Sequence, residues 1–308
     1  MTVESCPIDV DLHRDHWLAL RKPLITASEV SAVFGEEGKN PFMTALDLYL
    51  AKIHGPKQFD DDATMRGRHL EAAALSHTRE DRPNWQIKNC DNFYRDRLIG
   101  IGATPDSVNC HGEPVEFKCP FEPTFYEKWT DQPPIHNQLQ ALVQAMLMDA
   151  PRAWLVAYIV TTFKVSLHTY EVPRHPAAEK QIMDGVTAFW QRIKDGNPPP
   201  AQYGRDTEAL SMLYPRDDGS AVDLTGDNRL PDLLARRVSI TTKMRELTQE
   251  KQTIDDELRD KLGEAEEGTL PGWRLTWKTE IRKEKLFTPS SSTRVLRVSD
   301  RRKKEGLT

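Results

Sequence analysis

Two acidic residues and a lysine stand close together in the segment TPDSVNCHGEPVEFKCP, residues 104–120. Asp106 and Glu116 flank a stretch rich in turn-forming residues, and Lys118 follows Glu116 by two positions. If the turn centres on His111, the two acids lie opposite each other on antiparallel strands, with Cβ atoms about 4.5–5.5 Å apart. Because side chains alternate along a strand, Lys118 shares the face of Glu116 while Phe117 turns toward the core. The spacing predicts two carboxylates and an ammonium on one surface.

Two carboxylates this close repel each other, and a divalent cation between them would relieve the repulsion. Oxygen ligands suit Mg²⁺ or Mn²⁺ better than zinc. A metal ion lowers the pKa of bound water and neutralises charge on a phosphate, so this grouping favours phosphodiester hydrolysis, with Lys118 orienting or helping to deprotonate the water. The alternative is a surface hairpin whose acids form ordinary salt bridges with Lys118 or Arg97.

The composition fits one main domain plus an appendage: 308 residues, 38% hydrophobic, net charge -5. No run of about 18 apolar residues and no signal-peptide pattern is present, which predicts a cytoplasmic protein without a membrane span. The four cysteines show no metal-ligand spacing and are expected to be free thiols, and the scattered histidines complete no zinc set. The mild acidity argues against a surface coated for nucleic acid but permits a local basic channel.

Periodicity in the first 200 residues predicts helices around one mixed sheet, an α/β or α+β domain. Thr26 and Glu29 fit a capping box that opens an early helix. The stretches with helical spacing are 40–55, 65–80, 134–150 and 177–196. The stretches typical of strands are 92–120, 152–160 and 163–172.

Three consecutive prolines in GNPPPAQYG, residues 196–204, predict a domain boundary. We expect a core over 1–200, a linker over 201–228 and a C-terminal unit over 229–308. In that unit a long helix is predicted from apolar residues at heptad-like spacing, with Lys251 in the seam, and a strand pair follows over 272–287. The basic end, 294–308, is expected to be a solvated tail rather than a DNA contact. The apolar residues of the helix are Ile240, Met244, Leu247, Ile254 and Leu258.

Beyond the hairpin, the motif PD at 105–106 followed by ExK at 116–118 resembles the PD-(D/E)XK nuclease superfamily. The surrounding sequence, over residues 18 to 165, is similar to one branch of this superfamily, the phage lambda exonuclease and YqaJ-type viral recombinase nucleases. The matching pieces occur in the family's order and are RKPLITASEV, GRHLEAAAL, FYRD, VEFKCP and NQLQ. The region after residue 200 is not accounted for by the shorter lambda enzyme, although LPGWRLTWK resembles the tails of longer YqaJ-type proteins.

The resemblance implies a restriction-endonuclease-like core with a central mixed sheet flanked by helices, and a helical and β-hairpin appendage. It implies that Asp106, Glu116, the Phe117 carbonyl and Glu71 hold the metal ion, with Lys118 next to the attacking water. The positions that match the surroundings of a 5′-phosphate are Arg21, Ser28, Thr104 and Gln138. Asp96 fits the family pattern as well, but a salt bridge with Arg95 or Arg97 explains it equally.

An independent argument supports Ser28, which is expected in the first turn of a capped helix, where free N–H groups favour a phosphate. Arg21 can bind the same phosphate bidentately. The alternative reading of Ser28 is plain capping, and that of Gln138 is an exposed polar residue.

The resemblance implies a Mg²⁺-dependent exonuclease, with Mn²⁺ able to substitute, that digests one strand of linear duplex DNA from a 5′ end. It implies a ring-shaped homotrimer, a single-strand annealing protein as partner, and phage or prophage origin in a bacterial host. The alternatives are a restriction-like endonuclease on the same core and a non-catalytic DNA-binding or recruiting protein.

Overall fold

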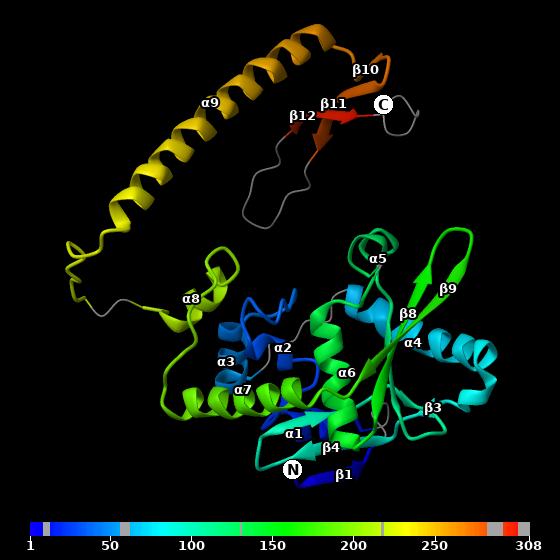
Figure 1. Ribbon diagram of the computed structural model, residues 1–308. Helices are drawn as coiled ribbons and strands as arrows, with labels where there is room; N and C mark the ends of the chain where they lie inside the picture. The colour runs from blue at the N-terminus through cyan, green and yellow to red at the C-terminus, as the bar shows by residue number, and fades with distance from the viewer. Residues whose placement is uncertain (9–12, 56–61, 130, 217–218, 282–291, 301–308) are drawn as a thin grey trace. The chain divides into compact units, whose positions relative to one another are not determined.

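The computed structural model describes residues 1–8, 13–55, 62–129, 131–216, 219–281 and 292–300, and divides the chain into two units, 1–218 and 219–308 (Figure 1). The α/β class predicted from the sequence is confirmed, since mixed sheets are flanked by helices. No helix among the described residues is both long and apolar enough to cross a membrane.

The first unit contains two sheets rather than the single sheet that we expected. One has the strand order β1-β4-β5-β2 and the other β3-β6-β7-β8-β9. The strands of the first are β1 (Val3–Pro7), β4 (Asn92–Asp96), β5 (Ile101–Ala103) and β2 (Ile25–Thr26). Those of the second are β3 (Lys88–Asn89), β6 (Ser107–Val108), β7 (Pro114–Lys118), β8 (Arg152–Val160) and β9 (Val165–Pro173).

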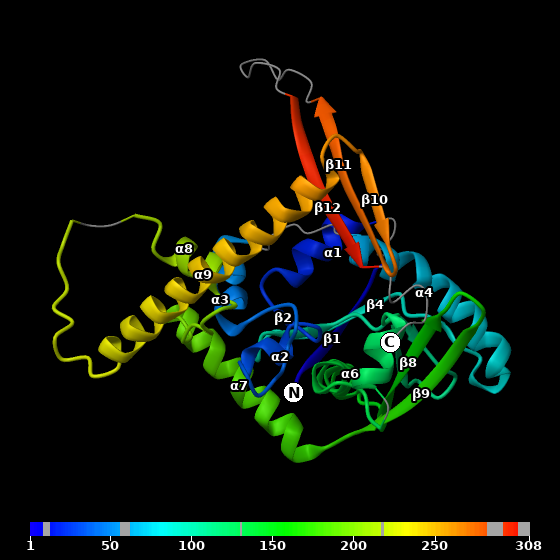
Figure 2. The same cartoon turned by 90° about the horizontal axis from the view of Figure 1, so that it is seen from above.

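Helices cover both faces of the five-stranded sheet (Figures 1 and 2). Ala153 and Leu155 of β8 pack with α6, whereas Val156 and Tyr158 join a cluster that includes α4 residues, so successive β8 side chains are buried on opposite faces. Parallel pairing of β7 with β8 requires a crossover, and α5 and α6 provide it. The helices of this unit are α1 (Arg14–Arg21), α2 (Val30–Val33), α3 (Ala45–His54), α4 (Asp62–Asp81), α5 (Glu122–Lys128), α6 (Ile135–Met148), α7 (Pro176–Lys194) and α8 (Thr207–Leu213), with a 3-10 turn, η1 (Pro83–Trp85).

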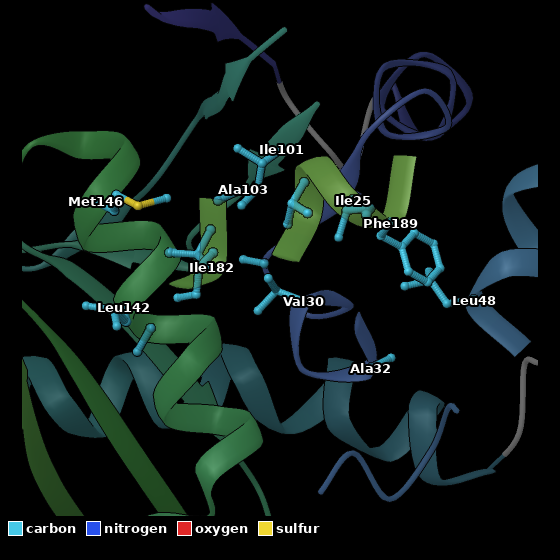
Figure 3. Close-up of a cluster of buried hydrophobic side chains, with 14 of the residues drawn as sticks. Ile25, Val30, Ala32, Leu48, Ile101, Ala103, Leu142, Met146, Ile182 and Phe189 are labelled. Carbon is cyan, nitrogen blue, oxygen red and sulfur yellow. The ribbon is translucent and has the colours of Figure 1, made fainter. Parts of the chain in front are cut away.

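The main hydrophobic core joins the two sheets through α6 and α7 (Figure 3). Ile101 of β5 and Leu142 of α6 belong to it, as do Ile182 and Phe189 of α7. Because α6 contacts strands of both sheets, it fixes the position of one sheet relative to the other.

The division between residues 218 and 219 falls inside the linker expected over 201–228, but the first unit extends past the proline run. Helix α8 belongs to the first unit because its Ala209 lies in the main core and the Asp206 carboxylate, fully buried, accepts a hydrogen bond from Thr44 Oγ1 at 2.6 Å. The prolines at 198–200 therefore turn the chain without ending the domain.

The second unit combines one long helix with a small antiparallel sheet. It contains α9 (Leu230–Leu262), β10 (Glu267–Leu270), β11 (Trp273–Ile281) and β12 (Ser292–Asp300), in the strand order β10-β11-β12. The predicted long helix is confirmed. The predicted solvated tail is wrong for 294–300, which belong to β12 and pair with β11, while 301–308 and residues 282–287 of the expected strand pair lie outside the described residues.

Candidate active site

The β6–β7 hairpin has the register that the sequence predicted. Ser107 pairs with Val115 and Val108 with Pro114, a register that centres on residue 111 and extends to Asp106 opposite Glu116. The Asp106 carboxylate accepts a hydrogen bond from the Phe117 main-chain N–H at 2.8 Å. The structure therefore brings the two acids to the same end of β7.

Glu116 is buried, and its two carboxylate oxygens are held by three side chains. Lys118 Nζ and Gln140 Nε2 donate to Glu116 Oε1 at 2.6 and 2.5 Å, and Gln144 Nε2 donates to Oε2 at 2.6 Å. Gln140 and Gln144 lie one turn apart on α6, so they face β7 together. Sequence reasoning missed both, although Gln144 in the apolar second half of α6, one turn after Gln140, was a usable signal.

Glu71 enters the site from α4, on the opposite side of the sheet from α6. Ala74 and Leu75 of α4 pack in one cluster with Val115 and Phe117 of β7, as the alternation of β7 side chains requires. Arg66 Nη1 donates to the Cys119 carbonyl at 2.8 Å, which ties the start of α4 to the end of β7. The negative charge of Glu71 reaches both Asp106 and Lys118 and raises their pKa values, so the fourth predicted residue lies with the other three.

Charge crowding dominates the electrostatics of this cluster. Burial, then the charges of Glu116 and Glu71, raise the pKa of Asp106 well above its ordinary value, despite opposing effects of Lys118 and the Phe117 N–H. Burial lowers the pKa of Lys118, but Glu116, Asp106 and Glu71 together outweigh it and the net shift is upward. Lys118 is therefore an ammonium at neutral pH in the metal-free protein and acts as a hydrogen-bond donor rather than a base.

The donor set fits a hard divalent cation, because carboxylates are oxygen ligands. The raised pKa of Asp106 indicates an excess of negative charge at the site, which a cation would neutralise. In the part of the chain that is described, no three His, Cys, Asp or Glu side chains are grouped closely enough to hold a metal ion as they stand. Both oxygens of Glu116 already accept hydrogen bonds, from Lys118 and the two glutamines. Binding an ion would require Glu116 to exchange one of these partners.

A second group of residues gathers around Arg21 at the end of α1. The Arg21 guanidinium lies 4.0 Å from the centre of the Trp17 ring, and its Nη2 is 3.3 Å from Thr26 Oγ1 and 3.4 Å from Ser28 Oγ. Trp17 Nε1 donates to Thr104 Oγ1 at 2.9 Å. Three of the four residues predicted for a 5′-phosphate are thus connected, and Trp17, which sequence reasoning missed, links Thr104 to Arg21.

This group and the acid cluster act on each other electrostatically. Burial lowers the pKa of Arg21, while the charges of Glu29 and Glu116 favour its charged form. A guanidinium remains protonated under all ordinary conditions. The Arg21 guanidinium is therefore a permanent positive charge close to the acid cluster.

The helix-dipole argument for Ser28 is wrong. The helix that follows, α2, has only four residues and begins at Val30, so Ser28 lies in the preceding turn. Glu29 supplies half of the predicted capping box, since its Oε2 accepts the Thr26 N–H at 2.8 Å, and both of its oxygens also bind Lys52 Nζ. Any anion bound at Ser28 depends on Arg21 and the hydroxyl groups.

Two other predicted residues serve the scaffold in this structure. Gln138 donates from Nε2 to the Pro133 carbonyl at 2.6 Å, whereas Gln140, two positions later, faces Glu116. Asp96 is fully buried in the turn between β4 and β5 and accepts hydrogen bonds from the main-chain N–H groups of Thr2, Leu98 and Ile99, at 2.7, 2.9 and 3.1 Å. The expected pairing of Asp96 with its flanking arginines is replaced, because both of them bind Glu4.

The chain is similar in structure to known exonucleases. An alkaline exonuclease from Laribacter hongkongensis, LHK-Exo, has a TM-score of 0.50 and 21% sequence identity over 59% of this chain and 94% of that chain. LHK-Exo in complex with dAMP gives 0.47 and 20% over 65% and 97% of the two chains, and a phage-related exonuclease from Haemophilus somnus 129PT gives 0.42 and 11% over 58% and 99%. No curated protein matches the chain.

Over 59% of its length the chain therefore shares the fold of the alkaline exonuclease LHK-Exo. Residues 16–150 match the model of the YqaJ-like viral recombinase domain, in agreement with the resemblance that the sequence motifs indicated. That range contains the acid cluster, Lys118 and the Arg21 group, and ends two residues before β8.

Proposed function

We propose that this protein is a Mg²⁺-dependent exonuclease, with Mn²⁺ as a substitute, that digests one strand of linear duplex DNA from a 5′ end. The observation that carries the proposal is the meeting of Asp106 with the Glu116–Lys118 pair at the end of β7, inside the YqaJ-like segment. Digestion in this direction leaves 3′ single-stranded overhangs, the substrate for recombination of phage type.

The metal ion would be held by Asp106, Glu116, Glu71 and the Phe117 carbonyl. When bound, it would supply charge neutralisation at the scissile phosphate and a water of lowered pKa. Lys118, 2.6 Å from Glu116 in the metal-free protein, keeps its proton and can donate hydrogen bonds to a phosphate oxygen or to the attacking water. Gln140 and Gln144 orient the Glu116 carboxylate from α6.

Arg21 would bind the 5′-phosphate, because its guanidinium is fixed on the Trp17 ring and points toward two hydroxyl groups. Ser28 and Thr104 would contribute hydroxyl groups around the same anion. We give Gln138 no contact with the phosphate, because its amide N–H binds the loop before α6.

The remaining features of the proposal rest on the family resemblance. They are a homotrimer through which DNA passes, a single-strand annealing protein as partner, and action in the cytoplasm of a bacterial host by a protein of phage or prophage origin.

The test uses linear duplex DNA with one labelled end, carrying either a 5′-phosphate or a 5′-hydroxyl, with Mg²⁺ or with EDTA. We expect mononucleotides released from the 5′ end only with Mg²⁺, faster from the phosphorylated end, and no cleavage of closed circular duplex. Cleavage of the circle would show an endonuclease instead. Binding of DNA without cleavage under any metal would show a non-catalytic protein.

Variants of α1 test the anion contact. Arg21→Ala should lower the rate on the phosphorylated end by about 10- to 100-fold, the value of a charge-assisted hydrogen bond, and change the hydroxyl end little. Arg14→Ala removes the same charge from the same helix and should leave the preference intact, since Arg14 lies farther from the Trp17 ring, at 6.0 Å. An equal loss on both ends from Arg21→Ala would mean a structural role.

A further inference from the structure

Helix α9, coloured yellow to orange in Figure 1, has an exposed apolar face along most of its length. A helix of this size is about 50 Å long. Its buried residue is Leu262, at the end that meets the sheet, where Leu262 lies against Gly268. Apolar side chains along the rest are 44–65% exposed, namely Leu233, Ile240, Met244, Leu247 and Ile254. Helices in proteins owe most of their stability to packing of such a face.

The apolar residues of α9 follow a heptad repeat. With Met244 at position a, the d positions are Leu233, Ile240, Leu247, Ile254 and Lys261. The remaining a positions are Leu230, Arg237, Lys251 and Leu258. The d row is apolar over four heptads, whereas the a row contains two cations.

Charge is distributed unevenly between the two halves of this helix. Residues 230–245 contain one acid and four bases, whereas residues 246–262 contain six acids and three bases. A second α9 placed antiparallel sets the basic half against the acidic half, and a parallel one sets like against like.

We propose that α9 pairs with α9 of a second copy of this chain as an antiparallel two-helix coiled coil. The full-overlap alignment joins residues whose numbers add to 491, so Met244 packs against Leu247 of the second copy. Leu233 then packs against Leu258, and the stems of Arg237 and Lys251 lie over Ile254 and Ile240. No cation in the seam meets another cation.

The flanking charges favour the same alignment. In an antiparallel pair, g positions face each other, which places Lys243 beside Glu250 of the second copy and Arg236 beside Glu257, each twice by symmetry. In a parallel pair, Arg237 and Lys251 would each meet their own copy, and Glu250 would face Asp255. In this chain Glu257 pairs with Lys261 at 3.1 Å, an exposed contact that is easily exchanged.

The test measures the mass of the full-length protein by sedimentation or light scattering. We expect an even number of copies, which is six where α9 joins two of the proposed trimers, and half that mass for Leu247→Lys. This substitution puts a charge into the seam of an exposed helix without changing a buried core. If the wild type and Leu247→Lys have the same mass, the proposal is overturned, because the apolar face of α9 then does not join one copy of the chain to another.

Charge variants then test the antiparallel alignment. Lys243→Glu should raise the dissociation constant roughly tenfold or more, since two attractive pairs become repulsive. Arg245→Glu makes the same charge change at an outward position and should have little effect. The double variant K243E/E250K should restore association. Equal effects of the two single variants, or no recovery in the double variant, overturn the alignment. Each readout is a mass, so none depends on the proposed nuclease activity.

Discussion

Replacing Asp106 by Asn should stabilise the metal-free protein while abolishing cleavage. The carboxylates of Asp106 and Glu116 are taken to lie about 5 Å apart, near the Cβ separation of opposed residues on antiparallel strands. At an effective dielectric constant of about 20, two unit charges at this distance repel by about 3 kcal/mol. The attraction of Asp106 to Lys118 and its stronger hydrogen bond to the Phe117 N–H offset part of this. We expect a net gain of about 1–2 kcal/mol for Asn, whose oxygen can still accept the Phe117 N–H.

The pH dependence of this gain follows from the raised pKa of Asp106. The folded protein binds this proton more tightly than the unfolded chain does. The corresponding stability is complete below the ordinary pKa of an aspartate and is lost as the pH rises through the raised value. The advantage of Asp106→Asn should therefore be largest at neutral pH and shrink in acid.

Thermal unfolding in EDTA at neutral pH is the measurement, and we expect the melting temperature of Asp106→Asn to be roughly 2–6 °C above wild type. Mg²⁺ should then stabilise the wild type and not the variant. The control is Asp96→Asn at a fully buried aspartate of the scaffold, whose oxygens accept three main-chain hydrogen bonds; this variant should lose about 1–3 kcal/mol of unfolding free energy. A lower melting temperature for Asp106→Asn, or shifts of the same sign in both variants, would refute the charge-crowding argument.

Three further predictions concern residues around the site and the core. Gln144→Met removes the hydrogen-bond donor to Glu116, but it also removes a buried amide oxygen without a described partner. The free energy of unfolding should therefore change by no more than about 1 kcal/mol, while the cleavage rate should fall at least about tenfold. Asp206→Ala strands buried donors between α8 and α3 and should cost about 2–4 kcal/mol in denaturant unfolding. Burial, with smaller effects of nearby acids, raises the pKa of Cys119 to about 11, so iodoacetamide at pH ~8 should alkylate exposed Cys110 far faster, which peptide mass spectrometry would show.

The sequence predicted the long elements well because their signal is local. The boundaries of β8 and the end of α3 at Gly55 follow from continuous apolar runs and a glycine cap. Short elements were predicted poorly: the two-residue β2 was missed, and the early helix expected to open at Thr26 begins at Val30 and has four residues. Strand β2 is stabilised by β5, a partner distant in sequence. The separation into two sheets depends on which strands pair, which periodicity does not encode.

The candidate site shows the same division. Opposed Asp106 and Glu116 follow from turn position and strand alternation, which are properties of one hairpin. The choice of Gln140 over Gln138 as the residue facing Glu116 depends on the rotation of α6 against β7, which only the packed core determines. Likewise, the role of Asp96 as a turn acceptor depends on where β1 pairs.

The position of the two glutamines restricts how the length of this chain can change. One residue inserted between Gln140 and Gln144 would rotate one amide by about 100° relative to the other, so that both could no longer face Glu116, and would break up the apolar face of α6 that joins the two sheets. In the crossover from β7 to α6, Phe125 and Trp129 are fixed by their packing against β8, so the exposed residues 131 and 132 are where the number of residues can change. Length differences between related chains are therefore expected in that crossover, with the spacing from Gln140 to Gln144 kept at one helical turn.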